Sequence, residues 1–177
     1  TNAAIKATQG ELLIDNQGLY VDAYFSSHAG SYTNTPEGAW GLSPRRYLIP
    51  VKEPITSQWQ MELTKLELEE KLKDLRLESI DAITIINRSL EGRASQILLS
   101  GIGKHILLSG EEFRHKLGLR STNFDITYAA NSITISGIGY GHGIGMSQHG
   151  AKYLAEHGET YEEILGHYYR GARLLKL

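Results

Sequence analysis

The chain has 177 residues, of which 41% are hydrophobic and 21% are charged, a composition that suits one globular domain with a proper core. The formal net charge is −2 and no cluster of lysine and arginine occurs, so we expect no nucleic-acid partner. The absence of cysteine excludes disulfides and thiolate metal sites, and no apolar run approaches the ~20 residues of a membrane-spanning helix.

The first third of the sequence predicts short strands followed by one long loop. Residues 11–14 and 19–25 flank a polar stretch that ends in glycine, which is a β-hairpin signal. From residue 26 to residue 54 the hydrophobic periodicity fails, and loop-forming residues and prolines dominate. A loop of this length inside a compact domain is more often functional than idle.

Three helix starts share one signature, a Ser or Thr followed three residues later by Glu. In this capping box the hydroxyl and the carboxylate satisfy backbone donors reciprocally. The pairs are Thr64 with Glu67, Ser109 with Glu112, and Thr160 with Glu163. They predict helices over about residues 65–75, 110–117 and 161–170. A fourth helix is predicted over residues 146–157, with Gly158 as its stop.

Strand-like runs alternate with these helices in no regular order. They cover residues 80–86, 95–100, 105–108, 124–128 and 132–136. Because no βαβ alternation is present, we predict an α+β fold. It should contain mixed antiparallel strands, about four short helices and the long loop at residues 26–54.

Residues 137–151 are the most unusual stretch of the chain. Glycine occupies every second position from Gly137 to Gly145, which indicates unusual backbone angles or another group close to the backbone. We expect the glycines on both sides of His142 to leave room for a bulky ligand. With Ser147 and Gln148 following, the run presents an imidazole, a hydroxyl and an amide. The alternative is a glycine-rich strand end that runs into a helix, with the polar groups serving as caps.

Two other kinds of chemistry fit parts of this stretch less well. His28, His142 and His149 could supply three metal ligands, but the last two lack the spacing and the adjacent glutamate of a zincin. We therefore expect no metal and no cofactor. A serine hydrolase would need Gly-x-Ser-x-Gly around Ser147, where the sequence reads Met-Ser-Gln.

Residues 139–151, Gly-Tyr-Gly-His-Gly-Ile-Gly-Met-Ser-Gln-His-Gly-Ala, strongly resemble the signature of the family of the stage II sporulation protein D and the LytB amidase enhancer. Residues 3–10 with the predicted hairpin, residues 108–124 and residues 161–171 resemble further segments of that family. The resemblance covers essentially the whole chain. It implies that residues 1–177 are the C-terminal part of a single peptidoglycan-acting domain.

The resemblance implies a protein exported from bacteria, located in the cell wall, the periplasm or the forespore intermembrane space. The best-understood members are lytic transglycosylases that act on peptidoglycan glycan strands stripped of stem peptides. In that reaction a carboxylic acid protonates the glycosidic oxygen, and a base draws the sugar's own 6-hydroxyl onto C1, which leaves a 1,6-anhydro end.

The family's chemistry also suggests roles for individual residues. We expect the catalytic set His142, Ser147 and Gln148 to line a saccharide groove and to orient the acid or the 6-hydroxyl. The glycan-binding set is expected to comprise Tyr140, Gly141, Gly143, His28 and Trp40, with Tyr140 and Trp40 as stacking surfaces.

The sequence departs from the family pattern in two places. The essential glutamate of the family lies in a Glu-Met-Pro segment upstream of the matched region, and no Glu-Met-Pro occurs here, so we expect this chain alone not to cleave glycan. Some members hold zinc through cysteine and histidine near the first loop, but Ala29 stands where a cysteine would. The alternative function is a non-catalytic wall-binding or amidase-enhancing module, whose partner would be a cell-wall amidase.

Overall fold

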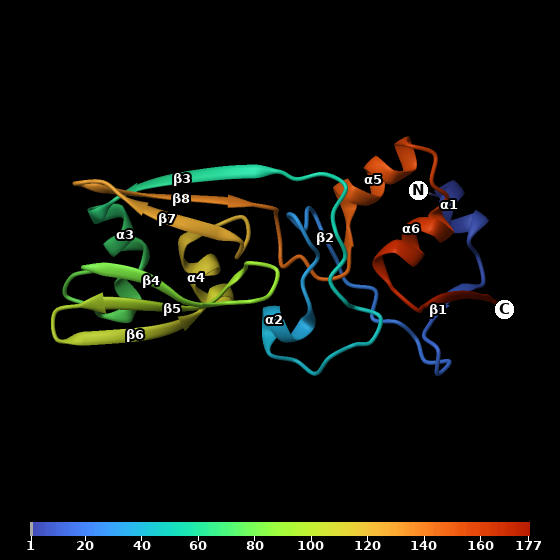
Figure 1. The fold of residues 1–177 in the computed structure, drawn as a ribbon, viewed down its shortest axis with the longest axis horizontal. Helices are drawn as coiled ribbons and strands as arrows, with labels where there is room; N and C mark the ends of the chain where they lie inside the picture. Colours follow the sequence, from blue (N-terminus) through green and yellow to red (C-terminus); the bar gives the residue numbers. More distant parts are fainter. Residues whose placement is uncertain (1) are drawn as a thin grey trace.

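The computed structural model describes residues 2–177 and shows an elongated molecule with two lobes (Figure 1). Residues 58–138 form one lobe, which we call the inserted lobe. Residues 2–57 and 139–177 form the other, the terminal lobe, and both chain ends lie there. Each lobe has its own hydrophobic core. The chain crosses between the lobes twice, and the second crossing is the glycine run.

The inserted lobe contains two antiparallel sheets of three strands each, with two helices. The first sheet has the order β3 (Gln58–Thr64), β8 (Ser132–Ile138), β7 (Phe124–Tyr128), and the second has the order β4 (Ala82–Arg88), β5 (Ala94–Gly101), β6 (Lys104–Ser109). The helices are α3 (Lys65–Lys71), which is followed by a 3-10 turn at Lys73–Leu75, and α4 (Gly110–Leu117). Phe113 of α4 stacks on Phe124 of β7 with ring centroids 5.8 Å apart, so the helix is anchored in the core.

The terminal lobe is built from segments at both ends of the chain. β1 (Glu11–Ile14) pairs antiparallel with β10 (Arg173–Lys176), and β2 (Phe25–Ser26) pairs in parallel with β9 (Met146–Ser147). Its helices are α1 (Asn2–Ala7), α2 (Pro36–Trp40), α5 (Gln148–Glu156) and α6 (Tyr161–Tyr168). The core contains Tyr47, Leu48, Val51, Ile144, Ile164, Tyr168 and Tyr169.

The α+β prediction is confirmed, and all three predicted capping boxes form with both reciprocal hydrogen bonds. The structure has six α-helices in residues 2–177 where about four were expected; the two additional helices, α1 and α2, are short, with six and five residues. α2 lies inside the predicted long loop, where Thr35 Oγ1 accepts a hydrogen bond from the Gly38 backbone N–H and caps the helix. Among residues 2–177, no helix has the length and apolar character needed to cross a membrane.

The predicted hairpin at residues 11–25 forms only beside its turn, where the Asp15 N–H donates to the Leu19 carbonyl at 2.8 Å and the Val21 N–H donates to the Leu13 carbonyl at 3.0 Å. The full strand pairing of β1 is with β10, in a register that places Leu12 opposite Leu175 and Leu13 opposite Leu174. This pairing gives the leucines of β1 apolar partners, whereas the second half of the expected hairpin contributes only a single bridge between Ile14 and Tyr20. The helix predicted from residue 146 begins two residues later, because Met146 and Ser147 form β9.

Candidate functional site

The glycine run joins β8 of the inserted lobe to β9 of the terminal lobe and packs tightly along the long loop. Tyr140 and His28 exchange two backbone hydrogen bonds, of 2.7 and 3.0 Å, and the Asn34 N–H donates to the Gly143 carbonyl at 2.8 Å. Gly139, Gly141, Gly143 and Gly145 all have positive φ, between 69° and 106°. L-residues rarely adopt these angles, so the alternating glycines follow from the backbone path.

The space beside these glycines is filled by the protein itself. A Cβ atom at Gly145 would overlap the carbonyl oxygen of Tyr24, and one at Gly143 would overlap the guanidinium of Arg93. The sequence correctly predicted that a group approaches the backbone closely. The expectation that the glycines flanking His142 leave room for a ligand is wrong: Gly143 is buried beneath Arg93, and a Cβ atom at Gly141 would lie 3.1 Å from the Cβ of Ser26.

His142 is half-buried at the junction of the lobes, and its ring is held in a defined orientation. The Ile144 backbone N–H donates to His142 Nδ1 at 3.0 Å, so Nδ1 is the acceptor and the neutral ring carries its proton on Nε2. Burial lowers the pKa of His142. The charge of Glu111 opposes this effect, whereas the charges of Arg114 and Arg93 add to it. A hydrogen bond to the backbone carbonyl of Phe25 also opposes the fall in pKa, so this carbonyl lies within reach of the Nε2–H, which a ligand oxygen would have to take over.

An exposed aromatic ring, that of Trp40, lies next to His142. The Trp40 ring lies 4.9 Å from the His142 ring and 5.4 Å from the Tyr24 ring, centroid to centroid. Trp40 is 40% exposed and Tyr140 is 54% exposed, and the Arg120 guanidinium lies 6.0 Å from the Tyr140 centroid. An apolar ring face beside hydrogen-bonding groups is a surface on which a sugar can stack. We call Trp40 and His142 the ring surface.

The remaining predicted site residues occupy different environments. Ser147 is fully buried, and its Oγ accepts a hydrogen bond from the Gly150 N–H at 3.1 Å, so it caps α5. His28 is buried, and its Nδ1 accepts from the Gly30 N–H at 3.2 Å. Gln148, in the first turn of α5, is exposed. The structure thus brings Trp40 and His142 together near the surface, leaves Tyr140 exposed beside Arg120, and buries the Ser147 hydroxyl and His28.

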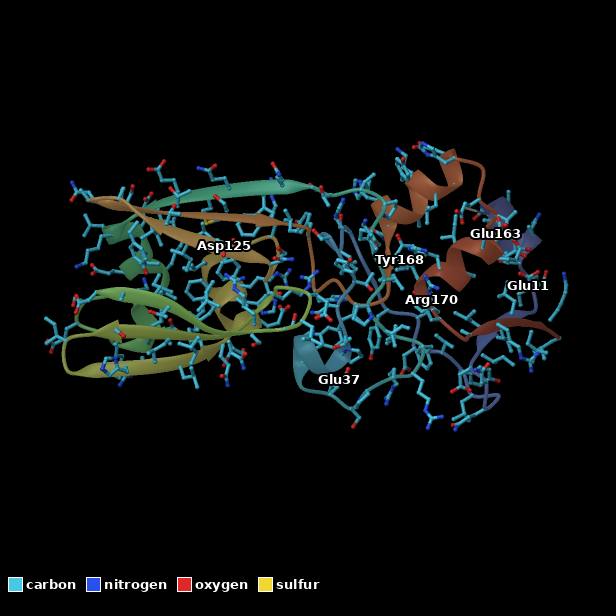
Figure 2. The ribbon with its side chains drawn as sticks, in the orientation of Figure 1. Glu11, Glu37, Asp125, Glu163, Tyr168 and Arg170 are labelled. Atoms are coloured by element: carbon cyan, nitrogen blue, oxygen red, sulfur yellow. The ribbon has the colours of Figure 1, made fainter. Side chains whose placement is uncertain are left out.

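A buried carboxyl group that sequence reasoning missed lies under α5. Glu53 is 5% exposed, and its neighbours Ser147 and Tyr168 are also buried. A Cβ atom at Gly150 would lie 2.6 Å from Glu53 Oε2 and 3.2 Å from Ser147 Oγ, and would overlap the Tyr168 hydroxyl, so the three polar groups converge on the first turn of α5. Figure 2 shows Tyr168 where α6 approaches the junction of the lobes.

Burial raises the pKa of Glu53 to about 7, although the hydroxyls of Ser147 and Tyr168 and the charge of Arg93 favour the ionised form. Neither carboxylate oxygen makes a hydrogen bond of good geometry. In the sequence Glu53 lies between Lys52 and Pro54 in a proline-rich loop, which resembles a solvated segment and gives no signal of burial.

Across residues 2–177 the structure gathers no set of three His, Asp or Glu side chains suited to holding a metal ion.

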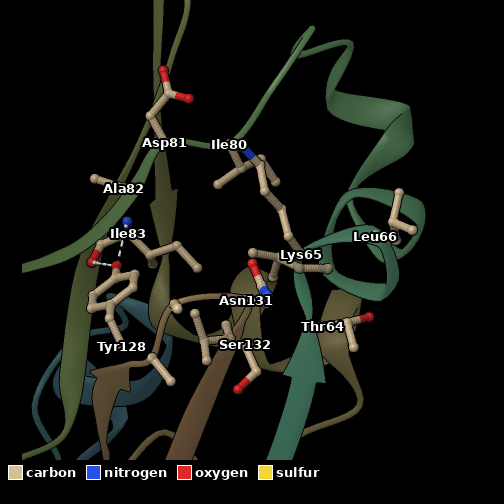
Figure 3. A pocket seen from close by; sticks show the side chains of 14 residues that line it. Thr64, Lys65, Leu66, Ile80, Asp81, Ala82, Ile83, Tyr128, Asn131 and Ser132 are labelled. Atoms are coloured by element: carbon tan, nitrogen blue, oxygen red, sulfur yellow. Dashed lines mark hydrogen bonds between the residues drawn. The ribbon is translucent and has the colours of Figure 1, made fainter.

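Two hollows lie elsewhere on the inserted lobe. A cavity of about 550 Å³ at the outer end lies between α3, β4 and the turn from β7 to β8 (Figure 3). There Tyr128 Oη bonds both the backbone N–H and the carbonyl of Ile83, each at 2.7 Å. The second hollow, of about 600 Å³, lies beside Trp59 and Gly137 at the start of the glycine run. Neither includes a member of the ring surface.

The sequence matches a known group of proteins. The chain belongs to the family described as "Domain of unknown function (DUF8618)", which matches residues 51–145, from the end of the long loop through most of the glycine run. The sequence is 32% identical to stage II sporulation protein D of Bacillus subtilis (strain 168), over 97% of this chain and 50% of that protein. It is 34% identical to stage II sporulation protein D of Bacillus amyloliquefaciens, over 95% of this chain and 48% of that protein.

The chain is also 30% identical to the amidase enhancer of Bacillus subtilis (strain 168), over 98% of this chain and 32% of that protein. These similarities confirm the resemblance to the family of stage II sporulation protein D and the LytB amidase enhancer, a cell-wall-related family. The chain spans about half the length of the sporulation proteins that it matches, and about a third of the amidase enhancer.

Proposed function

We propose that this chain is the glycan-binding part of a peptidoglycan lytic transglycosylase domain that works outside the cytoplasm. The observation that carries the proposal is the ring surface, in which exposed Trp40 lies 4.9 Å from a half-buried His142 whose Nδ1 is already engaged. One sugar ring would stack on an aromatic face while His142 Nε2–H and the Gln148 amide bind its oxygens.

Within this proposal His142 orients the substrate. Because the Ile144 N–H occupies Nδ1, the group that His142 offers a sugar is a donor, suited to holding the 6-hydroxyl or the glycosidic oxygen in place. The proton for the leaving oxygen comes from a carboxylic acid, which the family resemblance assigns to the glutamate of its Glu-Met-Pro segment. Glu53 does not take that role, since both its oxygens are buried away from any bound sugar.

A second function is favoured by one of the relatives. The amidase enhancer of Bacillus subtilis matches 98% of this chain. A protein that binds glycan without cleaving it could use the same ring surface to bring a cell-wall amidase to its substrate. The two functions differ in product: a transglycosylase releases 1,6-anhydro-muramic ends, whereas an enhancer raises the release of stem peptides by an added amidase.

Substituting His142 tests the proposed transglycosylase function. Asparagine keeps an acceptor near the position of Nδ1 for the Ile144 N–H but removes the Nε2 donor, whereas glutamine places its amide near the position of Nε2. With the full-length protein and denuded glycan strands, we expect His142→Asn to form 1,6-anhydro ends at least about tenfold more slowly than wild type, and His142→Gln to retain more activity. Mass spectrometry of the products provides the readout.

His157 is the matched control, because it is exposed and stacks on Tyr153 at the far end of α5. His157→Asn should leave the rate unchanged. Wild-type protein that releases no anhydro ends but stimulates an amidase would favour the second function. A folded His142→Asn variant with the wild-type rate would contradict the role given to this residue.

A further inference from the structure

Arg93 belongs to the inserted lobe, but its guanidinium reaches the terminal lobe at the candidate site. It lies just before β5, in the turn that follows β4, and it is 1% exposed. Its Nη2 donates to the carbonyl oxygen of Ala29 in the long loop, and its Nη1 donates to Thr122 Oγ1 at 3.4 Å. The same guanidinium occupies the space where a side chain at Gly143 would begin. One side chain therefore contacts both lobes, the long loop and the glycine run.

The placement of this charge is costly, because a buried guanidinium gives up its hydration. Its hydrogen-bond acceptors are a carbonyl and a hydroxyl, and its Nε has no partner in the described part of the chain. Glu111, Glu91 and Glu53 compensate its charge from a distance. Burial lowers the pKa of Arg93 to about 10, so the group stays charged at neutral pH. An apolar side chain of similar length would fill this space without that cost.

The backbone around His142 is fixed from two sides. Asn34 Nδ2 donates to the His142 carbonyl at 3.1 Å, and the Asn34 N–H donates to the Gly143 carbonyl. Arg93 packs against Gly143, the residue that follows His142. The position of the imidazole relative to Trp40 thus depends on a side chain supplied by the inserted lobe.

We infer that Arg93 is a positioning residue for the glycan site: its guanidinium fixes the backbone at Gly143 and keeps His142 beside Trp40. The inference rests on the proposed function. It also assigns the inserted lobe a part in the site, although that lobe contributes none of the ring surface. The charges that act on His142 are Arg93, with Glu111 and Arg114 from α4.

The test uses Arg93→Met, which keeps much of the side-chain length and removes the charge, and Arg93→Lys, which keeps the charge and removes the fork of donors. Two quantities are measured on the 177-residue chain: its affinity for denuded glycan strands, and the titration of the His142 ring followed by NMR. We expect glycan binding to weaken about tenfold in both variants. The pKa of His142 should rise in Arg93→Met, stay close to wild type in Arg93→Lys, and fall in Glu111→Gln.

A role limited to stability would leave both the glycan affinity and the His142 titration of a folded Arg93 variant unchanged. Arg76→Met, at the outer end of the inserted lobe, is the matched control and should change neither quantity. If Arg93→Met fails to fold, the glycan affinity of the folded Arg93→Lys variant tests the inference, which expects binding about tenfold weaker than wild type. A folded Arg93 variant with wild-type affinity overturns the inference. A wild-type chain that binds no glycan contradicts the proposed function instead, and the His142 titration still reports whether Arg93 acts on that ring.

Discussion

Replacing Gly145 by alanine should destabilise the protein more than any other single methyl group added along the glycine run. Gly145 has a φ of 69°, and a Cβ atom there would overlap the backbone carbonyl oxygen of Tyr24. Positive φ costs a non-glycine residue about 1–3 kcal/mol, and overpacking against backbone adds a similar amount. We therefore expect Gly145→Ala to lower the free energy of unfolding by about 3–5 kcal/mol, a large share of the ~5–15 kcal/mol typical of a domain.

Gly103 separates the two contributions to this cost. Its φ is 63°, nearly that of Gly145, but no atom lies within 4 Å of the position that its Cβ would take. Gly103→Ala should therefore cost only the backbone term, about 1 kcal/mol. Urea unfolding of both variants measures the difference. Equal losses of stability would show that the close approach of Tyr24 does not decide why glycine stands at position 145.

The second large effect is a dependence of stability on pH, which we trace to Glu53. Burial raises the pKa of this carboxyl from 4.5 to about 7 in the folded protein. The unfolded state therefore loses the proton first, so the free energy of unfolding falls as pH rises from about 4.5 to about 7. The total loss is about 3 kcal/mol. Above that range the contribution is constant, because Glu53 is then ionised in both states.

Glutamine at position 53 removes this titration while keeping nearly the same shape. At pH 4.5 Glu53→Gln and wild type should differ little in stability, because the carboxyl is then largely neutral. At pH 8 the variant should be more stable than wild type by about 3 kcal/mol. Urea unfolding at both pH values provides the comparison, and Glu159→Gln, at an exposed position, is the control. Parallel pH profiles for wild type and Glu53→Gln would mean that Glu53 is not held in its neutral form by burial.

Local signals in the sequence predicted local structure well. The capping box at Ser109 and Glu112 joins groups three residues apart, so its donors and acceptors meet whatever the rest of the chain does. The hairpin prediction held only at the turn, since the full strand partner of β1 is β10 at the far end of the chain. A short polar loop indicates that a turn is possible, but it does not determine which strand pairs with β1.

The sequence predicted the glycine run of the candidate site but not the groups that pack around it. The alternating glycines correctly indicated a close approach to the backbone, and helix α5 begins just after Ser147. The groups that make the approach, Arg93 and the Tyr24 carbonyl, come from segments far away in the sequence. Glu53 was missed because only the packing of α5 and α6 over the long loop buries it. Burial of this kind depends on tertiary contacts that no short window of sequence contains.

The most direct test of the ring surface is the fluorescence of the two tryptophans during titration with denuded glycan strands. Trp40 is 40% exposed beside His142, whereas Trp59 is buried in the inserted lobe with its Nε1–H bonded to Ser121 Oγ at 3.2 Å. We predict a saturable change in emission that persists in Trp59→Phe and disappears in Trp40→Phe. No change in the wild-type chain, or a change that requires Trp59 and not Trp40, would contradict the assignment of the glycan site to the ring surface.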